Sequence, residues 1–172
     1  IAKFNKNVIV STGMCTMQEV RDALKILIKY GTKKNKITLL HCTSEYPAPI
    51  KEINLNAMLT IKKELKTKVG YSDHSLGIEV SIAAAALGAC VVEKHVKNDN
   101  DFKSLDSDFS LPVSKLKNFV EELNEAWVSI GQNKLTHDIL ETKSRIFKRS
   151  IYISKDIKKN EKLKSKNIKI IR

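Results

Sequence analysis

Two histidines occupy matching positions in two successive strand–helix units, within the stretch VGYSDHSLGIEVSIAAAALGACVVEKH over 69–95. One apolar run ends just before His74, and the Ala-rich segment 78–87 is predicted to be a buried helix that Gly88 ends. A second strand then leads to His95. Parallel strands joined by one helix place their carboxyl ends on one rim, where ligands bind in parallel α/β folds. The stretch therefore predicts an α/β fold with both histidines on its functional rim.

The spacing of the two histidines is a weak metal signal by itself, because it matches none of the short metal-binding motifs. Other polar residues strengthen it, since Ser72, Asp73 and Glu93 gather at the same strand ends. Imidazole and oxygen ligands with open positions suit a divalent ion that acts as a Lewis acid. We therefore expect His74 and His95 to bind a divalent ion, and Asp73 to fix the His74 tautomer without binding the ion.

Further segments repeat the strand–helix pattern on either side of this stretch. Strands are predicted over 7–11 and 37–40, and helices over 55–65 and 114–130. Another helix follows the first strand, where Thr16-Met17-Gln18-Glu19 has the spacing of a capping box. These patterns give four strand–helix units. They leave open an unclosed sheet or half of a closed barrel, because a full barrel needs about 250 residues.

Two further places on the rim carry polar or aromatic side chains. Ser11-Thr12-Gly13 stands where a strand passes into a helix, a position that favours either a bound anion or a plain turn. Prolines at 47 and 49 fix an extended loop that presents Tyr46 on a rigid support. His41, at the end of the same strand, is interpreted as an orienting or packed histidine. A long polar loop over 96–112 is expected to reach over a ligand.

The last part of the chain differs in character from the units before it. The segment 132–149 is charged and has no strong period, so it is interpreted as a connector. A strand is predicted over 150–153, a turn over 155–161 and a closing strand over 169–172. Asn160 stands within the turn, and asparagine tolerates a left-handed backbone.

The composition argues against two classes of protein, nucleic-acid binders and membrane-spanning proteins. The formal net charge of +12 would suit a nucleic-acid binder, but the excess is lysine spread over helix backs and loops without interleaved aromatics. A solvated lysine-rich surface is the better interpretation, with no nucleic acid as partner. No apolar run approaches the ~18 residues of a membrane span. The three cysteines stand in separate units without a CxxC motif, as in a cytoplasmic protein with reduced thiols.

Four motifs occur in the order and spacing of the sialic acid synthases, and the chain resembles the C-terminal part of such an enzyme. The motifs are STGM, LLHCTSEYPAP, VGYSDHSLGIEV and VVEKH. The resemblance implies the C-terminal half of a TIM (β/α)8 barrel over 1–131, a linker over 132–149, and the incomplete start of an antifreeze-like (SAF) domain over 150–172. The chain is accordingly expected to be a fragment without catalysis of its own.

The resemblance also implies an activity for the intact protein. Sialic acid synthases condense phosphoenolpyruvate with an N-acylated hexosamine such as N-acetylmannosamine, giving a nine-carbon nonulosonic acid and phosphate, with Mn²⁺ or Mg²⁺. An alternative within the family is a legionaminic or pseudaminic acid synthase acting on a diacetamido-trideoxyhexose. Outside enzymes, the chain could be a non-catalytic carbohydrate- or polyanion-binding fragment.

Residue roles follow from the same resemblance. His74 and His95 are the metal ligands, and Glu93 is the catalytic carboxylate that hydrogen-bonds water or moves a proton. The residues that match the family's substrate-binding positions are Ser11, Ser44 and Ser72 for phosphoenolpyruvate, and Tyr46, Asp106 and Arg172 for the sugar.

One loop departs from the family, with consequences for the sugar. Ser104-Leu105-Asp106-Ser107 replaces the usual Gly-Pro-Asp-His run, which puts the identity of the sugar in doubt. Arg172 matches the arginine that a domain-swapped homodimer places in the partner subunit's site.

Overall fold

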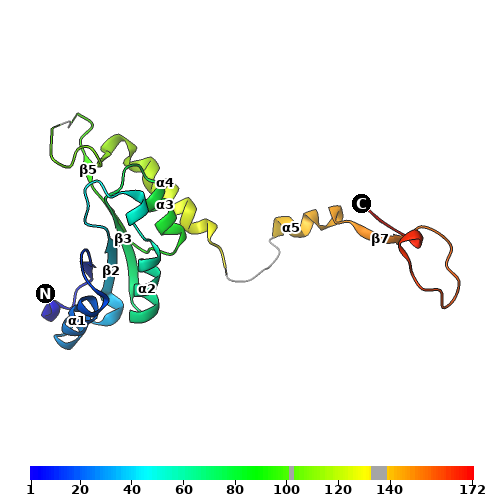
Figure 1. Cartoon of the computed structure of the whole chain (residues 1–172), viewed down its shortest axis with the longest axis horizontal. Coiled ribbons are helices and arrows are strands. Elements are labelled where there is room, and N and C mark those ends of the chain that lie inside the picture. Colours follow the sequence, from blue (N-terminus) through cyan, green and yellow to red (C-terminus); the bar gives the residue numbers. More distant parts are fainter. Residues whose placement is uncertain (101–102, 133–138) are drawn as a thin grey trace. The chain divides into compact units, whose positions relative to one another are not determined.

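Four parallel strands form the centre of the first of two units, Ile1–Gly131 and Gln132–Arg172 (Figure 1). The structure is a computed structural model that describes residues 1–100, 103–132 and 139–172. The strands are β1 (Val8–Ser11), β2 (Ile37–Cys42), β3 (Lys68–Asp73) and β4 (Val92–Lys94). They pair in the order β1-β2-β3-β4. Consecutive order without reversal is the topology of a curled (β/α) barrel sheet and not of a doubly wound sheet.

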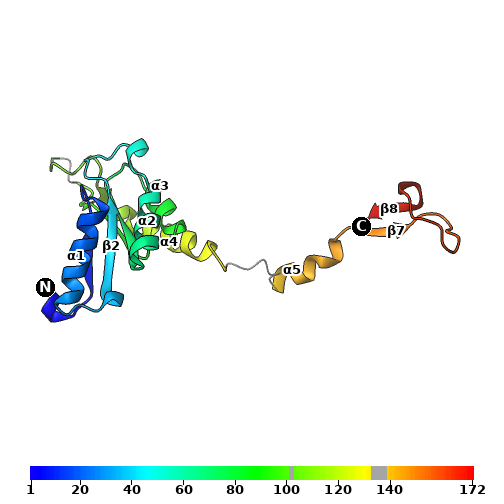
Figure 2. The ribbon, with the colours of Figure 1, turned by 60° about the horizontal axis from the view of Figure 1, so that its bottom comes forward.

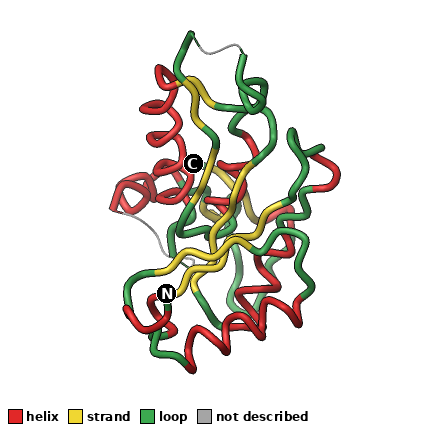
Figure 3. Tube along the Cα trace, turned by 90° about the vertical axis from the view of Figure 1, so that its left-hand side faces the viewer, coloured by secondary structure: helices red, strands yellow, loops and turns green. Residues whose placement is uncertain are grey.

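Helices connect the strands and pack beside them (Figures 2 and 3). The α-helices of the first unit are α1 (Met17–Lys29), α2 (Asn56–Leu65), α3 (Glu79–Ala86) and α4 (Val113–Ser129). A short parallel pair, β5 (Val96–Lys97) and β6 (Leu111–Pro112), brackets the loop before α4. Short 3₁₀ turns occupy Ala2–Phe4, Lys34–Lys36 and Ile50–Glu52. The helices and strands predicted from the sequence are confirmed, with ends that shift by one or two residues.

Local sequence determines where helix α1 begins. The Thr16 N–H donates to Glu19 Oε2 at 2.7 Å, and the Glu19 N–H donates to Thr16 Oγ1 at 3.3 Å. This reciprocal pair is the predicted capping box, and it satisfies two amides that the first helical turn leaves without partners. The hydrogen bonds that the Thr16 N–H and the Thr16 hydroxyl donate to the Glu19 carboxylate lower the pKa of that carboxyl.

The core lies between one face of the sheet and the helices. Alternate strand residues face it, among them Leu39 on β2 and Tyr71 on β3, and Met58 of α2 completes the contact. The intervening residues lie on the opposite face, where Ile9 of β1 is 55% exposed. Period-2 alternation therefore separates a structural face from a face that carries polar residues near the strand ends.

The described part of the second unit has a short helix and a strand pair. These are α5 (Ile139–Ser144), a 3₁₀ turn over Arg145–Phe147, and the antiparallel strands β7 (Ser150–Ile153) and β8 (Ile168–Ile171), with a last 3₁₀ turn over Ser165–Asn167. Asn160 has a φ of 69°, the left-handed conformation expected of the turn. Helix α5 is not predicted from the sequence, because six residues are too few to show an apolar period. The part of the connector over 133–138 lies outside the described residues.

Candidate functional site

The strand register gathers polar residues at the carboxyl ends of the sheet. Cys42 of β2 stands opposite Ser72 of β3, which stands opposite Glu93 of β4. One step further, Asp73 stands opposite Lys94. Because side chains alternate between faces, the first row and the second row point to opposite sides of the sheet. The rim therefore has two separate polar groups, one on each face.

The two predicted metal ligands lie together. The ring centroids of His74 and His95 are 5.4 Å apart, and the ring planes are 76° from parallel. The centroid separation is compatible with two metal–nitrogen bonds of about 2.1 Å to one ion, and a shared ion stays a prediction. The structure thus brings together the histidines that the sequence placed on adjacent strand ends.

Hydrogen bonding decides which nitrogen of His74 is available to a ligand. His74 Nδ1 lies 2.8 Å from the carbonyl oxygen of Thr43, which can only accept, so Nδ1 carries the proton. Nε2 is therefore the nitrogen left to face a ligand. It lies 3.4 Å from Ser72 Oγ, which donates its own proton to Glu93 Oε1 at 2.7 Å. A neutral imidazole with this tautomer would present a basic nitrogen near the Glu93 carboxylate.

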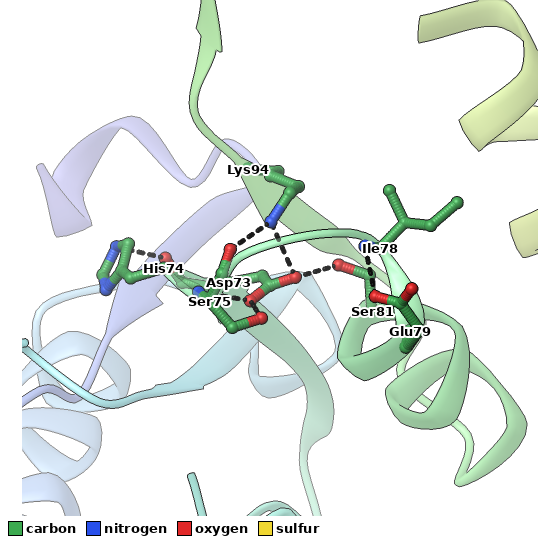
Figure 4. A network of polar contacts seen from close by, with 8 residues as sticks. Asp73, His74, Ser75, Ile78, Glu79, Ser81 and Lys94 are labelled. Atoms are coloured by element: carbon green, nitrogen blue, oxygen red, sulfur yellow. Dashed lines mark hydrogen bonds and ion pairs between the residues drawn. The ribbon is translucent and has the colours of Figure 1, made fainter. Parts of the chain in front are cut away.

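The expectation that Asp73 fixes the His74 tautomer is wrong. The carbonyl of Thr43 fills that role, while the Asp73 carboxylate accepts hydrogen bonds from Ser75, Ser81 and Lys94. The reason is the alternation of side chains along β3, which turns residue 73 away from residue 74. Figure 4 shows His74 extending away from the cluster that surrounds Asp73.

Tyr46 forms a wall of the histidine site. Its ring centroid lies 4.2 Å from that of His74 and 6.0 Å from that of His95, and Tyr46 remains 52% exposed. The loop that carries it is held to β3 by the Ala48 N–H, which donates to the His74 carbonyl at 2.9 Å. The Tyr46–Pro47 peptide is cis. Tyr46 is therefore presented at the rim from an anchored loop, as predicted.

Phe109 is a neighbour of the site that the sequence did not reveal. It is buried, and its ring centroid lies 4.9 Å from that of His95 and 5.6 Å from that of Tyr46. Phe109 comes from the polar loop between β5 and β6. The loop has two phenylalanines in an otherwise polar sequence, at 102 and 109, and the sequence does not say which rings they contact.

The same loop brings Asp106 to His95. Asp106 Oδ2 lies 3.4 Å from His95 Nδ1, and both side chains are partly exposed. The Leu111 N–H donates to the His95 carbonyl at 2.8 Å, which ties the end of the loop to the rim. The loop therefore lies beside the histidines as the sequence indicated, and the role of Asp106 toward a sugar stays a prediction.

The three predicted phosphoenolpyruvate serines differ in their surroundings. Ser11 is exposed at the end of β1, and Ser72 is buried. Ser44 lies against the turn after β1, because a Cβ placed on Gly13 would collide with Ser44 Oγ. The Thr12 hydroxyl is already used, since it donates to the Leu40 carbonyl at 2.9 Å. All three serines stand at or just beyond strand carboxyl ends, and a shared anion pocket stays a prediction.

Two other residues singled out from the sequence lie elsewhere. His41 Nε2 lies 2.7 Å from the Ile53 carbonyl and its ring packs 5.9 Å from Tyr71, so the interpretation of a packed histidine is confirmed. Arg172 belongs to the second unit, where it lines a surface hollow with Phe147 and Arg149. Its role in a partner's site stays a prediction.

The donor set fits an ion that keeps open coordination positions. Among the described residues, no group of three or more His, Cys, Asp or Glu side chains could hold a metal. Two imidazoles, His74 binding through Nε2, would leave the remaining positions to water or substrate oxygens, as a Lewis-acid role requires.

No helix within the described ranges is long and apolar enough to cross a bilayer.

Comparison with known proteins identifies the family. Residues 1–135 match the model of the NeuB family. The chain is 45% identical to N,N'-diacetyllegionaminic acid synthase of Campylobacter jejuni over 162 residues, which cover 94% of this chain and 48% of that protein. It is 41% identical to pseudaminic acid synthase of the same organism over 173 residues, covering 100% and 50%.

A solved structure agrees with the fold. The N-acetylneuraminic acid synthetase of Leptospira borgpetersenii superposes with a TM-score of 0.76 at 32% identity, covering 85% of this chain and 50% of that one. The chain thus spans about half the length of the proteins it matches. The resemblance to sialic acid synthases is confirmed at the level of the family, and the α/β unit is the half-barrel expected of it. The chain belongs to the NeuB family.

Proposed function

We propose that the full-length protein is a nonulosonic acid synthase, which condenses phosphoenolpyruvate with an N-acylated hexosamine and releases phosphate. The observation that carries the proposal is the convergence of His74, His95, Glu93 and Tyr46 at one rim of a NeuB half-barrel. This rim offers a basic imidazole nitrogen, a carboxylate and an aromatic wall within one space. The activity would take place in the cytoplasm, where phosphoenolpyruvate is available.

The reaction needs positive charge near the aldehyde oxygen and a base that accepts a proton from the attacking water. C3 of phosphoenolpyruvate bonds to the aldehyde carbon of the open-chain sugar, water adds at C2, and the C–O bond to phosphate breaks. A divalent ion, Mn²⁺ or Mg²⁺, held by His74 and His95 would supply positive charge that polarises the aldehyde. Glu93, which accepts from the Ser72 hydroxyl at 2.7 Å, would take the proton that the water loses.

The remaining rim residues would bind the two substrates. Ser11, Ser44 and Ser72 would bind phosphoenolpyruvate oxygens, with the Ser72 hydroxyl donating to the substrate in place of Glu93, and Tyr46 and Asp106 would contact the sugar. The acceptor is N-acetylmannosamine or a diacetamido-trideoxyhexose. Identities of 45% and 41% to legionaminic and pseudaminic acid synthases favour the second, as does the replaced Gly-Pro-Asp-His run around Asp106.

A panel of acceptors tests the proposal. Full-length protein with Mn²⁺ and phosphoenolpyruvate is mixed with N-acetylmannosamine or with 2,4-diacetamido-2,4,6-trideoxyhexoses, and phosphate release and product mass are measured. Phosphate release that requires one sugar and yields the mass of a nonulosonic acid is the expected result. Sugar binding without phosphate release would support a non-catalytic carbohydrate-binding protein instead, and retention on a polyanion without any metal requirement would support a polyanion binder.

The second unit is proposed to start an antifreeze-like domain that exchanges between two subunits of a homodimer. The strand pair β7 and β8 and the left-handed turn at Asn160 support this assignment. Arg172 would then reach the partner's site and meet the N-acyl oxygen of the sugar.

Mixing two inactive full-length variants, Arg172→Ala and His74→Gln, tests the exchange. Each heterodimer would contain one site with an intact His74 and an intact Arg172 from the partner. Activity should return in part. Verified heterodimers that are no more active than either parent would contradict the exchange.

A further inference from the structure

A buried ion pair joins β3 and β4 beside the two histidines. Lys94 Nζ lies 3.0 Å from Asp73 Oδ2, and the two side chains are 2% and 0% exposed. Asp73 immediately precedes His74, and Lys94 immediately precedes His95. The pair lies on the face of the sheet that packs against α3, and the His74 imidazole points away from it (Figure 4).

Lys94 contacts the residues on both sides of His74, the side chain of Asp73 and the backbone of Ser75. Besides Asp73, its ammonium donates to the Ser75 carbonyl at 2.9 Å. The Asp73 carboxylate in turn accepts from the Ser75 N–H at 2.8 Å and from the Ser75 hydroxyl at 2.6 Å. The residue before His74 and the residue after it are thus both bound to the residue before His95.

Helix α3 completes the network. The Ser81 hydroxyl donates to Asp73 Oδ2 at 2.5 Å, so the carboxylate is tied to the helix that connects the two strands. Both carboxylate oxygens of Asp73 have two partners each. Such full satisfaction is what allows a charge to be buried without a large penalty.

We propose that Asp73 and Lys94 are positioning residues that set the separation and orientation of the His74 and His95 imidazoles. The inference rests on the proposed metal role of the two histidines. Stability alone does not account for the pair, because apolar residues of similar volume replace buried ion pairs at little cost or even stabilise proteins. A network that fixes one strand end relative to its neighbour keeps both nitrogens aimed at one point.

The test measures metal binding and stability separately in the full-length protein. Lys94→Met removes the charge and keeps most of the stem, and Ser81→Ala removes one hydrogen bond to Asp73 as a milder change. Lys117→Met is the matched control, because the Lys117 side chain is 88% exposed on α4. Isothermal titration with Mn²⁺ without substrates gives the Kd, and thermal unfolding of the metal-free protein gives the Tm.

Lys94→Met should weaken Mn²⁺ binding about 10- to 100-fold, as other losses of groups that orient metal ligands do. Ser81→Ala should weaken it several-fold, and Lys117→Met should leave it unchanged. In metal-free protein, NMR of ¹⁵N-labelled histidines should show altered His74 and His95 ring signals in both variants and an unaltered His41.

A purely structural role predicts a different pattern. A folded variant with a lower Tm but a Kd within twofold of the wild type would overturn the proposal. If Lys94→Met does not fold, Ser81→Ala decides by the same criterion. Failure of the wild-type protein to bind Mn²⁺ at all would instead contradict the proposed metal site, so the two failures are distinguishable.

Discussion

Replacing Tyr71 by phenylalanine should stabilise the protein. The Tyr71 side chain is fully buried in the core between β3 and the helices, and within the described residues its hydroxyl has no hydrogen-bond partner. Burial, followed by the nearby Asp73 carboxylate, raises the pKa of the phenol well above its ordinary value. The group therefore stays neutral at every pH at which the protein is handled.

The size of the effect follows from the missing hydrogen bond. Burying a hydroxyl without a partner costs about 1–3 kcal/mol, and phenylalanine fills the same space without that cost. Tyr71→Phe should raise the free energy of unfolding by up to about that amount, which corresponds to a rise in Tm of a few degrees. Because the phenol does not ionise, the increment should be equal at pH 6 and pH 9.

Thermal unfolding of full-length wild-type and Tyr71→Phe proteins, followed by circular dichroism, measures the increment. Tyr71→Leu serves as the control, because it also removes the hydroxyl but leaves a cavity and should lower the Tm. A Tm for Tyr71→Phe that falls below the wild-type value at both pH values would refute the reasoning, since it would mean that the hydroxyl contributes a favourable interaction.

Two further predictions concern the candidate site. Ser72→Ala should raise the KM for phosphoenolpyruvate roughly tenfold, the loss expected for a hydrogen bond to a charged group. Steady-state kinetics that show an effect confined to the sugar's KM would contradict it. Partial burial raises the pKa of the Cys42 thiol, so iodoacetamide at pH 8 should label the exposed Cys15 and Cys90 first, as measured by mass spectrometry of the peptides. Labelling of Cys42 at an equal rate would contradict the raised pKa.

Much of the fold could be predicted because its determinants are local. The capping box at Thr16, the left-handed turn at Asn160 and the alternating apolar runs depend on residues that are near one another in sequence. The pairing of His74 with His95 followed from one further rule, that parallel strands joined by a helix end on the same rim. These patterns do not distinguish an open sheet from a half-barrel, and the prediction of a half-barrel rests on the family motifs.

The contacts that could not be predicted from the sequence depend on strand register or on loop conformation. Asp73 adjoins His74 in sequence, but strand alternation turns the two side chains apart. The partnership of Asp73 with Lys94 depends on the exact register of β3 against β4, which sequence patterns do not fix. Phe109 reaches His95 only through the path of a long loop.

Electron spin-echo spectroscopy of Mn²⁺ bound to the full-length protein tests the central claim most directly, because it detects nitrogen nuclei bonded to the ion. The wild-type protein should show coupling to two imidazole nitrogens, and the His74→Gln and His95→Gln variants should each show coupling to one. Absence of nitrogen coupling in the wild type, or modulation that is unchanged in both variants, would contradict the two-histidine metal site.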